Sequence, residues 1–411
     1  MRNVAVVGAG IVGMCTAAYL QRVGAQVTVF DPVEPGRSCS YGNAGGLSPG
    51  SCIPVAYPGV VKQVPGWLID PDAPLVLKWG YLPKAAPWLM RFIKAGSPEQ
   101  FQHSAAALSA IMRPVFDSYQ PLLAEAKAEH LVRRLGQLYV YETEAAFKGD
   151  ALGWETRRKH GVRFEVLSAD EVRQSEPDLA PIFARGVSLP EHGFCINPLG
   201  LVQAITATVH AKGGKVISER VLDVELEGDG IKSLVTPSGR HRFDAVIIAA
   251  GAWSHELARR FGHKVPLETQ RGYHAMLAEP SIAPRTTIMW AEKKFMATPM
   301  EKGLRFAGTV ELAGLQAPPD YRRADVLLKF GKQMFPGLEG GEVSRWMGHR
   351  PCLPDSLPVI GRSPKVRNAY FAFGHGHLGL SAASTTGRVM AELISGATPS
   401  IDLTPYRIDR F

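Results

Sequence analysis

Cysteine is scarce in this sequence and follows no pattern. The 411 residues include five cysteines, an odd number, and no two of them form a CxxC pair. Disulfide frameworks and zinc sites need cysteines that are paired or regularly spaced. We therefore expect neither of them, and we expect the protein to work in a reducing compartment such as the cytoplasm.

Clustered charge is also missing. Lys plus Arg number 46 and Asp plus Glu number 38, which gives a formal net charge of +8, and no block of five like charges occurs. Nucleic-acid platforms concentrate basic residues, so we expect no nucleic-acid partner. The 45% of hydrophobic residues and the length are typical of a globular protein with two or three domains' worth of core. A mildly basic surface suits anionic ligands or an anionic membrane face.

One apolar stretch without charged residues, Asn3–Leu20, has the look of a targeting segment or a marginal membrane span. Glycines at positions 8, 10 and 13 would weaken such a helix. The stretch is better explained by a folded motif, and we expect no part of the chain to span a membrane.

That motif is Gly8-Ala-Gly10-Ile-Val-Gly13, placed between a predicted strand over 3–7 and a predicted helix over 11–23. A second strand over 27–30 ends at Asp31. In such units the first glycine permits a tight turn, the second lets the backbone approach a pyrophosphate, and the third lets helix and strand pack closely. The helix N-terminus favours the anion, and an acid in the position of Asp31 accepts from ribose hydroxyls. The pattern predicts a dinucleotide site.

Strands and helices alternate along the rest of the chain, which is typical of an α/β fold. We expect a β-rich stretch over 270–310 to belong to a second domain, and a loop over 37–66. Predicted helices cover 103–130 (interrupted at prolines 114 and 121), 144–160, 197–212, 321–335 and 380–394. A capping box at Ser168–Glu171 opens a further short helix. Predicted strands cover 137–141, 215–218, 222–227, 243–249 and 369–373.

The segment Trp67–Ile93 is rich in aromatic residues, Leu and Pro, and follows no regular period. Two interpretations stay open. The segment is a buried lid or subdomain wall, or its aromatic residues contact a membrane or a partner.

Four stretches together carry a resemblance to a known family. They are the glycine motif with Asp31, Ser40–Gly50 (SYGNAGGLSPG), Gly348–Gly361 (GHRPCLPDSLPVIG) and Gly374–Gly379 (GHGHLG). In this order and spacing the sequence resembles the FAD-dependent amino-acid oxidoreductases of the D-amino-acid oxidase, glycine oxidase and sarcosine oxidase superfamily. It is most similar to the bacterial D-amino-acid dehydrogenase branch, small-subunit type.

The resemblance implies a Rossmann-like FAD-binding domain interleaved with an antiparallel-sheet α+β substrate domain. We place the FAD domain at residues 1–90, 190–260 and 350–411, and the substrate or cap domain at 91–189 and 261–349. FAD is expected to bind non-covalently, because Cys352 is displaced from the attachment position of the sarcosine-oxidase branch. The residues expected to contact FAD are Gly8, Gly10, Ile11, Val12, Gly13, Asp31, Ser40, Asn43, Ala44, Gly45, Gly46, Leu47, Val221, Gly251, His375, Gly376, His377, Leu378 and Gly379.

For the substrate, the resemblance points to Arg350, which occupies the place of the family's carboxylate-binding arginine. A planar, permanently charged guanidinium suits a bidentate carboxylate contact. Tyr273 is expected to donate to the same carboxylate and His274 to face the amine, with Tyr57 as a weaker lid candidate. Leu378 stands where sarcosine-oxidase relatives carry a lysine, which favours the D-amino-acid branch. His375 and His377 lack nearby carboxylate or cysteine ligands, so we expect no metal site.

The expected reaction is oxidation of the Cα–N bond of a D-amino acid by hydride transfer to FAD. D-Proline and hydroxy-D-proline are candidates beside D-alanine, and the electrons would pass to a quinone or another acceptor. Two alternatives stay open: an O2-using glycine or N-methyl-amino-acid oxidase, and a flavin-binding electron-relay subunit of a larger complex. Contact with the inner face of the cell membrane and oligomerisation are further expectations about partners.

Overall fold

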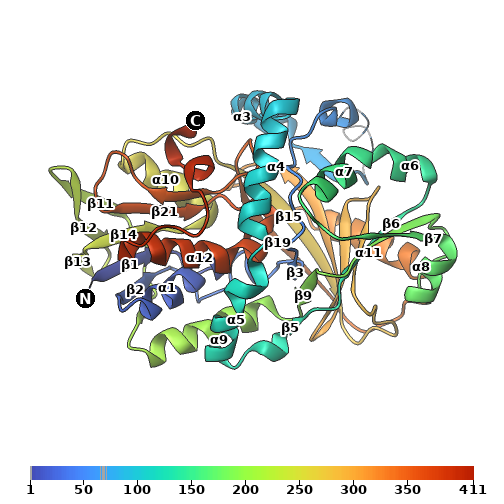
Figure 1. The fold of residues 1–411 in the computed structure, drawn as a ribbon, viewed down its shortest axis with the longest axis horizontal. Coiled ribbons are helices and arrows are strands. Elements are labelled where there is room, and N and C mark those ends of the chain that lie inside the picture. Colours follow the sequence, from blue (N-terminus) through green and yellow to red (C-terminus); the bar gives the residue numbers. More distant parts are fainter. Residues whose placement is uncertain (1, 65, 67–69, 71) are drawn as a thin grey trace.

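Two sheets lie side by side along the long axis of the molecule in a computed structural model that describes residues 2–64, 66, 70 and 72–411 (Figure 1). A six-stranded sheet with both termini nearby fills one half, and a nine-stranded sheet fills the other. Helix α4 (Pro98–Met112) runs between the two halves. This arrangement confirms the predicted α/β architecture with a second, sheet-based part.

The six-stranded sheet contains the predicted nucleotide-binding unit. Its order is β10 (Lys215–Ile217), β2 (Gln26–Phe30), β1 (Asn3–Val7), β14 (Ala245–Ile248), β21 (Ala369–Phe373) and β20 (Val359–Arg362). All neighbours are parallel except β20 and β21. Every residue of β14 is buried, as expected for a parallel strand covered on both faces.

Helices cover both faces of this sheet. On one face α1 (Ile11–Arg22), α9 (Pro198–Ala211) and α12 (Gly379–Ser395) contribute to one apolar core with the strands. On the other face α10 (Ser254–Arg260) packs with a small sheet of β11 (Asp223–Glu227), β12 (Gly230–Thr236) and β13 (Gly239–His241). The strand edge at which β1 meets α1 is thereby held rigidly from both sides.

The nine-stranded sheet is mostly antiparallel. Its order is β19 (Val343–Cys352), β15 (Glu268–Leu277), β18 (Gly303–Leu312), β17 (Phe295–Met300), β16 (Thr287–Trp290), β6 (Gln137–Tyr141), β8 (Arg185–Leu189) and β7 (Glu165–Ser168), with β4 (Leu75–Leu77) paired to β18. Helix α11 (Arg322–Met334) packs against one face of it through a second apolar core. The other face is turned toward the six-stranded half.

Several predicted elements differ in detail. The helix predicted over 103–130 is two helices, α4 and α5 (Val115–Ala126), because Pro114 stands between them, whereas Pro121 is accommodated inside α5. The helix predicted over 144–160 is α6 (Glu144–Gly149) followed by α7 (Ala151–Lys159). The predicted capping box opens α8 (Ala169–Ser175), with Ser168 and Glu171 bonding reciprocally.

Several elements have no counterpart in the prediction, and two of them form against the local sequence signal. Helix α3 (Leu82–Ala95) forms within the aromatic-rich segment, where Pro83 and Pro87 hide its helical pattern. Residues 67–69 and 71 of that segment lie outside the described residues. Strand β19 forms where Gly348 and Pro351 argue against a strand.

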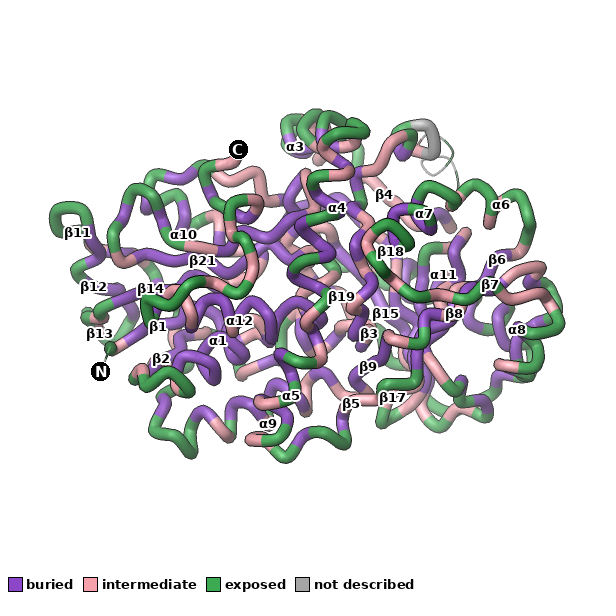
Figure 2. The backbone as a smooth tube through the Cα atoms, in the orientation of Figure 1, coloured by how far each residue is buried: buried purple, intermediate pink, exposed green. Residues whose placement is uncertain are grey.

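The packing also departs from the predicted domain boundaries at residues 98–126. We placed them in the substrate domain, yet α4 and α5 bury Leu108, Ile111 and Tyr119 in the core of the six-stranded half. The rest of the domain assignment stays a prediction. In the tube view, buried positions follow the strands of both sheets and exposed ones follow the outer helices and turns (Figure 2). No helix in the described part of the chain is long and apolar enough to cross a membrane.

Candidate active site

The glycine motif forms the tight connection between β1 and α1. Gly8 has φ +116°, and a Cβ placed there would lie 2.3 Å from the carbonyl oxygen of Ala249. A Cβ on Gly13 would lie 1.9 Å from the carbonyl oxygen of Gly8. The turn and the close helix–strand packing predicted for these two glycines are therefore confirmed, because no side chain fits at either position.

Asp31 and Ser40 hold this turn in place. The Asp31 carboxylate accepts hydrogen bonds from the backbone N–H groups of Ala9 at 2.7 Å and Val33 at 2.9 Å. Burial raises the pKa of Asp31, and the two N–H groups oppose that shift. The Ser40 hydroxyl accepts from the N–H of Ile11 at 3.0 Å, so it caps the first turn of α1.

A cavity of about 1240 Å³ begins at this helix N-terminus and extends between the two sheets. Its volume exceeds that of ordinary drug-sized ligand pockets, so it can take an extended ligand. Most residues predicted to contact the cofactor line it: Gly8, Gly10, Ile11, Val12, Asp31, Asn43, Ala44, Gly46, Val221, Gly251, His375, Gly376, His377, Leu378 and Gly379. Gly13, Ser40, Gly45 and Leu47 are not among its lining residues; they lie behind it and support its wall.

The loop at residues 43–47 brings the two halves into contact beside the cavity. Its short strand β3 (Gly46–Leu47) pairs with β9 (Gly193–Cys195), and Leu47 is fully buried. A Cβ on Gly46 would lie 3.3 Å from Cε of Met296 on the nine-stranded sheet. The loop is thus thin and close to the sheet, which suits a flat ring bound between them.

The GHGHLG stretch forms the turn before α12. Gly374 and Gly376 have positive φ values of +87° and +56°, so the turn needs glycine there. His375 is buried and its Nε2 lies 2.9 Å from the hydroxyl oxygen of Thr386. Burial lowers the pKa of His375 to about 3 and that of His377 to about 4, so both imidazoles are neutral at physiological pH. The N-terminus of α12 faces the cavity through Leu378 and Gly379.

Arg350 enters the cavity from edge strand β19 and reaches across its neighbour. Its guanidinium donates to the carbonyl oxygens of Thr309 at 2.7 Å and Gly308 at 3.2 Å, both on β18. A Cβ on Gly272 of the intervening strand β15 would lie 2.2 Å from the guanidinium carbon of Arg350. Burial lowers the pKa of Arg350, although an arginine side chain stays charged. Gly272 therefore provides the space that the guanidinium occupies.

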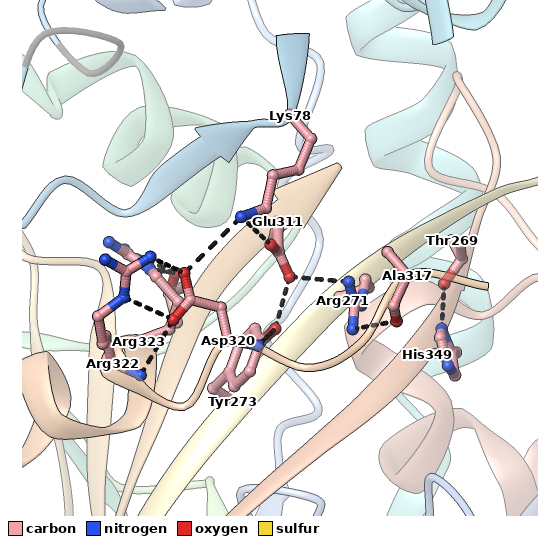
Figure 3. Close-up of polar contacts among 11 residues, drawn as sticks. Lys78, Thr269, Arg271, Tyr273, Glu311, Ala317, Asp320, Arg322, Arg323 and His349 are labelled. Atoms are coloured by element: carbon pink, nitrogen blue, oxygen red, sulfur yellow. Dashed lines mark hydrogen bonds and ion pairs between the residues drawn. The ribbon is translucent and has the colours of Figure 1, made fainter. Parts of the chain in front are cut away.

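Tyr273 lines the cavity, but the contacts of its hydroxyl do not support the role that we predicted for it. Its hydroxyl donates to Glu311 at 2.5 Å and accepts from the N–H of Asp320 at 3.0 Å (Figure 3). Figure 3 shows this hydroxyl within a network that also contains Arg271 and Lys78. The single hydroxyl proton is committed to a buried carboxylate, so this arrangement does not support donation to a substrate.

His274 does not support its predicted role either. It is 1% exposed, its Nδ1 lies 3.1 Å from the carbonyl oxygen of Gly42, and its ring stacks on Trp346 at 5.2 Å. It is not among the residues that line the cavity. Burial lowers the pKa of His274 to about 3. Tyr57, the weaker candidate, does line the cavity.

Gln270 and Trp346 are two of the cavity residues that the prediction missed. Gln270 pairs with Arg350 across β15 and β19, and Trp346 lies over Gly42 and Gly348, where added Cβ atoms would come within 2.1 and 2.0 Å of its ring. In β15 alternate residues share a face, so Gln270 and Gly272 belong together whereas Tyr273 points the other way. This alternation along β15 was the signal in the sequence that could have identified Gln270 as a cavity residue.

These features fit a dinucleotide with a flat ring. The helix N-terminus and turn glycines suit a pyrophosphate, the large cavity suits its length, and the thin loop beside the sheet suits the ring. If FAD is that group, residues of the glycine motif and Asp31 would hold its nucleotide end, and the 43–47 loop with the turn before α12 would hold its flavin.

Comparisons with known proteins agree with this geometry. Residues 3–393 match the family described as "DAO: FAD dependent oxidoreductase". Two curated relatives come from Bradyrhizobium diazoefficiens: a "D-amino-acid oxidase", 42% identical over 100% of this chain and 99% of its own, and a "D-amino acid dehydrogenase", 30% identical over the same shares. Among solved structures, the glycine oxidase from Geobacillus kaustophilus has a TM-score of 0.76 and 20% identity over 100% of both chains, which shows a shared fold.

Proposed function

The chain belongs to the family of FAD-dependent oxidoreductases described as DAO, and we propose that it oxidises the Cα–N bond of a D-amino acid. Within this proposal the electrons pass to a quinone or another acceptor, and cyclic substrates such as D-proline are candidates beside D-alanine. Both curated relatives carry names of enzymes that act on D-amino acids.

The observation that supports the proposal most directly is the place of Arg350. Its guanidinium lies in the cavity that also contains the glycine motif, and its hydrogen bonds go only to backbone carbonyl oxygens among the described residues. A substrate carboxylate would take the place of these neutral carbonyl acceptors. As a charged, bidentate acceptor it would bind the guanidinium more strongly than they do. An α-carboxylate held there leaves the rest of the amino acid between Arg350 and the turn before α12.

The residues of the chain position the substrate, while FAD supplies the two-electron acceptor. Arg350 would hold the carboxylate, Gln270 would offer an amide to it, and Trp346 and Leu378 would exclude water. Because the imidazoles of His375 and His377 are both neutral, neither carries a positive charge toward the amine. The substrate amine would lose its proton to solvent before oxidation.

Anaerobic mixing tests the proposal. We expect D-amino acids to bleach the bound flavin of the intact holoenzyme, and Arg350→Ala to raise KM about tenfold to a hundredfold because a charge-assisted pair is lost. Arg350→Lys keeps the positive charge but loses the forked pair of N–H donors, so its KM should lie between that of the unmodified enzyme and that of Arg350→Ala. A normal KM in Arg350→Ala for every amino acid tested would contradict the assignment.

The alternatives make different predictions in the same experiment. An O2-using glycine or N-methyl-amino-acid oxidase would form peroxide as fast as the flavin is reduced and would prefer glycine or sarcosine. An electron-relay subunit would bind FAD, but no amino acid would bleach it. Rapid dye or quinone reduction with slow peroxide formation supports the dehydrogenase.

Helix α3 supports a further part of the proposal, contact with an anionic membrane face. On and beside it Trp79, Met90 and Ile93 are 66%, 65% and 52% exposed. Residues 73–98 contain four basic residues and no acidic one. Leu89 and Phe92 of the same helix line the cavity, so a membrane bound here would lie next to its entrance. An apolar and basic helix face of this kind is typical of interfacial helices.

Sedimentation with phosphatidylglycerol vesicles tests this contact. We expect the holoenzyme to bind them more weakly as salt increases, and the double variant Trp79→Ser, Met90→Ser to lose most of the binding. Leu135→Ser, at a position that is 61% exposed outside α3, is the matched control. Equal binding of all three proteins would contradict the proposed contact.

A further inference from the structure

Another arginine, Arg157, lines the cavity at the end away from the glycine motif. Gly149 at the end of α6, Asp150 between the two helices, and Gly153 and Arg157 of α7 all line the cavity. Positions 149, 153 and 157 are four residues apart, so they share one face of the helical segment. Two of them are glycines, which leaves open space in front of the guanidinium.

Arg157 is a buried cation without an anionic partner among the residues that the structure describes. It is 9% exposed, and its guanidinium lies 4.5 Å from the centre of the Trp154 ring and 5.6 Å from that of Tyr139. Within the described part of the chain no hydrogen bond or ion pair of this guanidinium is found. The nearby Asp150 accepts instead from the Tyr141 hydroxyl at 2.8 Å. Aromatic rings attract a cation, but they do not satisfy its five N–H donors.

An apolar floor joins Arg157 to Arg350. Ala307, Met296, Met289 and Tyr139 are paired neighbours on four consecutive strands, and all line the cavity. Arg350 bonds to Gly308 and Thr309, next to Ala307, and Arg157 lies over Tyr139. Three strand spacings separate the ends of this row, or about 14 Å.

We propose that Arg157 binds an anionic group at the side-chain end of the substrate, so that the site favours D-amino acids with a distal carboxylate. This inference rests on the proposed function, because it assumes that Arg350 holds the α-carboxylate. Contacts of about 2.8 Å at each guanidinium leave several ångströms for the substrate chain itself. A chain of glutamate or 2-aminoadipate length suits this gap better than aspartate, and the two methionines provide an adaptable apolar surface for its methylenes.

The test compares D-glutamate with D-glutamine, which differ in charge but hardly in shape. We expect the holoenzyme to have the higher kcat/KM for D-glutamate, and Arg157→Met to lower the D-glutamate to D-glutamine ratio about tenfold to a hundredfold. Arg157→Lys keeps a positive charge, so it should lower the D-glutamate to D-glutamine ratio less than Arg157→Met does. Arg158→Met, which removes the exposed neighbouring arginine, should leave the ratio unchanged.

A binding measurement keeps the test decisive if Arg157→Met fails to fold. Glutarate should perturb the flavin spectrum of the unmodified holoenzyme at lower concentration than butyrate, since only glutarate can reach both arginines. An unchanged ratio in Arg157→Met, a preference of the holoenzyme for D-glutamine, or equal binding of glutarate and butyrate would overturn the inference. Failure of the proposed function would look different, because then no D-amino acid, D-alanine included, would bleach the flavin.

Discussion

At the residue scale, the reach of Arg350 depends on the absence of a side chain at Gly272. The arginine lies on β19 while its hydrogen-bond acceptors lie on β18, so its side chain must cross β15. Gly272 pairs with Gly348 at the crossing, and the pair of glycines leaves the surface of the sheet open there. The group that we propose to bind the substrate is thereby positioned by a residue that need not touch the substrate.

Replacement of Gly272 by Ala tests this positioning. The added Cβ would lie 2.2 Å from the guanidinium carbon, so the arginine must move. We expect KM for the amino acid to rise about tenfold or more, while kcat falls less and the bound flavin is retained. Gly80→Ala, where an added Cβ meets nothing within 4 Å, is the control. Unchanged KM in Gly272→Ala would show that the arginine does not need its present position.

At the element scale, β4 and α3 form a wall of the cavity that is anchored by the backbone pairing of β4 with β18 and otherwise by few polar side-chain contacts. Lys78 lies 3.7 Å from Glu311 and 3.8 Å from Asp320, as Figure 3 shows. Tyr81 donates to Glu268 at 3.0 Å, and the Trp88 indole donates to the carbonyl oxygen of Cys352 at 3.3 Å. Segments held by a few such contacts open locally at a lower free energy than the core sheets.

Lys78→Met should loosen this wall without unfolding the protein. The Lys78 side chain is 45% exposed, so we expect a loss of less than about 1 kcal/mol in the free energy of unfolding. Amide hydrogen exchange should become faster in residues 75–95 and stay unchanged in β1 and β14. Lys84→Met, at an exposed position of α3, serves as the control. Identical exchange in both variants would show that the ion pairs do not hold the wall.

At the scale of the whole molecule, the join between the two halves buries neutral imidazoles. His192, His274 and His375 are each at most 5% exposed, and burial lowers the pKa of each to about 3. In His192, Nε2 accepts from the N–H of Gly50 at 3.1 Å, and Nδ1 lies 2.9 Å from the side-chain oxygen of Gln137. A protonated imidazole carries a hydrogen on both nitrogens, so Nε2 of His192 could then no longer accept the hydrogen bond from Gly50.

These histidines make the folded state sensitive to acid. Their pKa values lie below the usual value of 6.5, so the unfolded chain binds more protons once the pH falls below about 6.5. Stability is then complete above pH 6.5 and declines toward pH 3, each histidine contributing at most about 1.4 kcal/mol per pH unit. Urea unfolding of the holoenzyme at pH 7.5, 6.5 and 5.5 should show the decline, with a shallower slope in His192→Gln. If the free energy of unfolding fell equally steeply with pH in the holoenzyme and in His192→Gln, this explanation would be contradicted.

Local chemistry explains what could be predicted of the fold. The first strand, turn and helix follow from apolar periodicity and from three glycines within six residues, all of which act over short sequence distances. Strand β19 and helix α3 contain glycine or proline, so the local sequence pattern does not indicate their secondary structure. Strand β19 forms because it pairs with β15, and α3 forms because Trp88 packs into the protein. The place of Arg350 in the cavity could be predicted because the residue belongs to a motif that resembles a known family.

The sequence by itself therefore determined the proposed nucleotide-binding end of the cavity, where motif residues lie next to one another in the chain. Only the tertiary structure decided the proposed substrate end. The face of β15 that meets the cavity is set by its register with β18 and β19, which turns Tyr273 toward Glu311 and buries His274 against Trp346. Arg157 belongs to α7, which lies far from β16 in the sequence. Its guanidinium reaches the apolar floor at Met289 only because β6, which carries Tyr139, pairs with β16. Such contacts depend on long-range pairing, which no local pattern encodes.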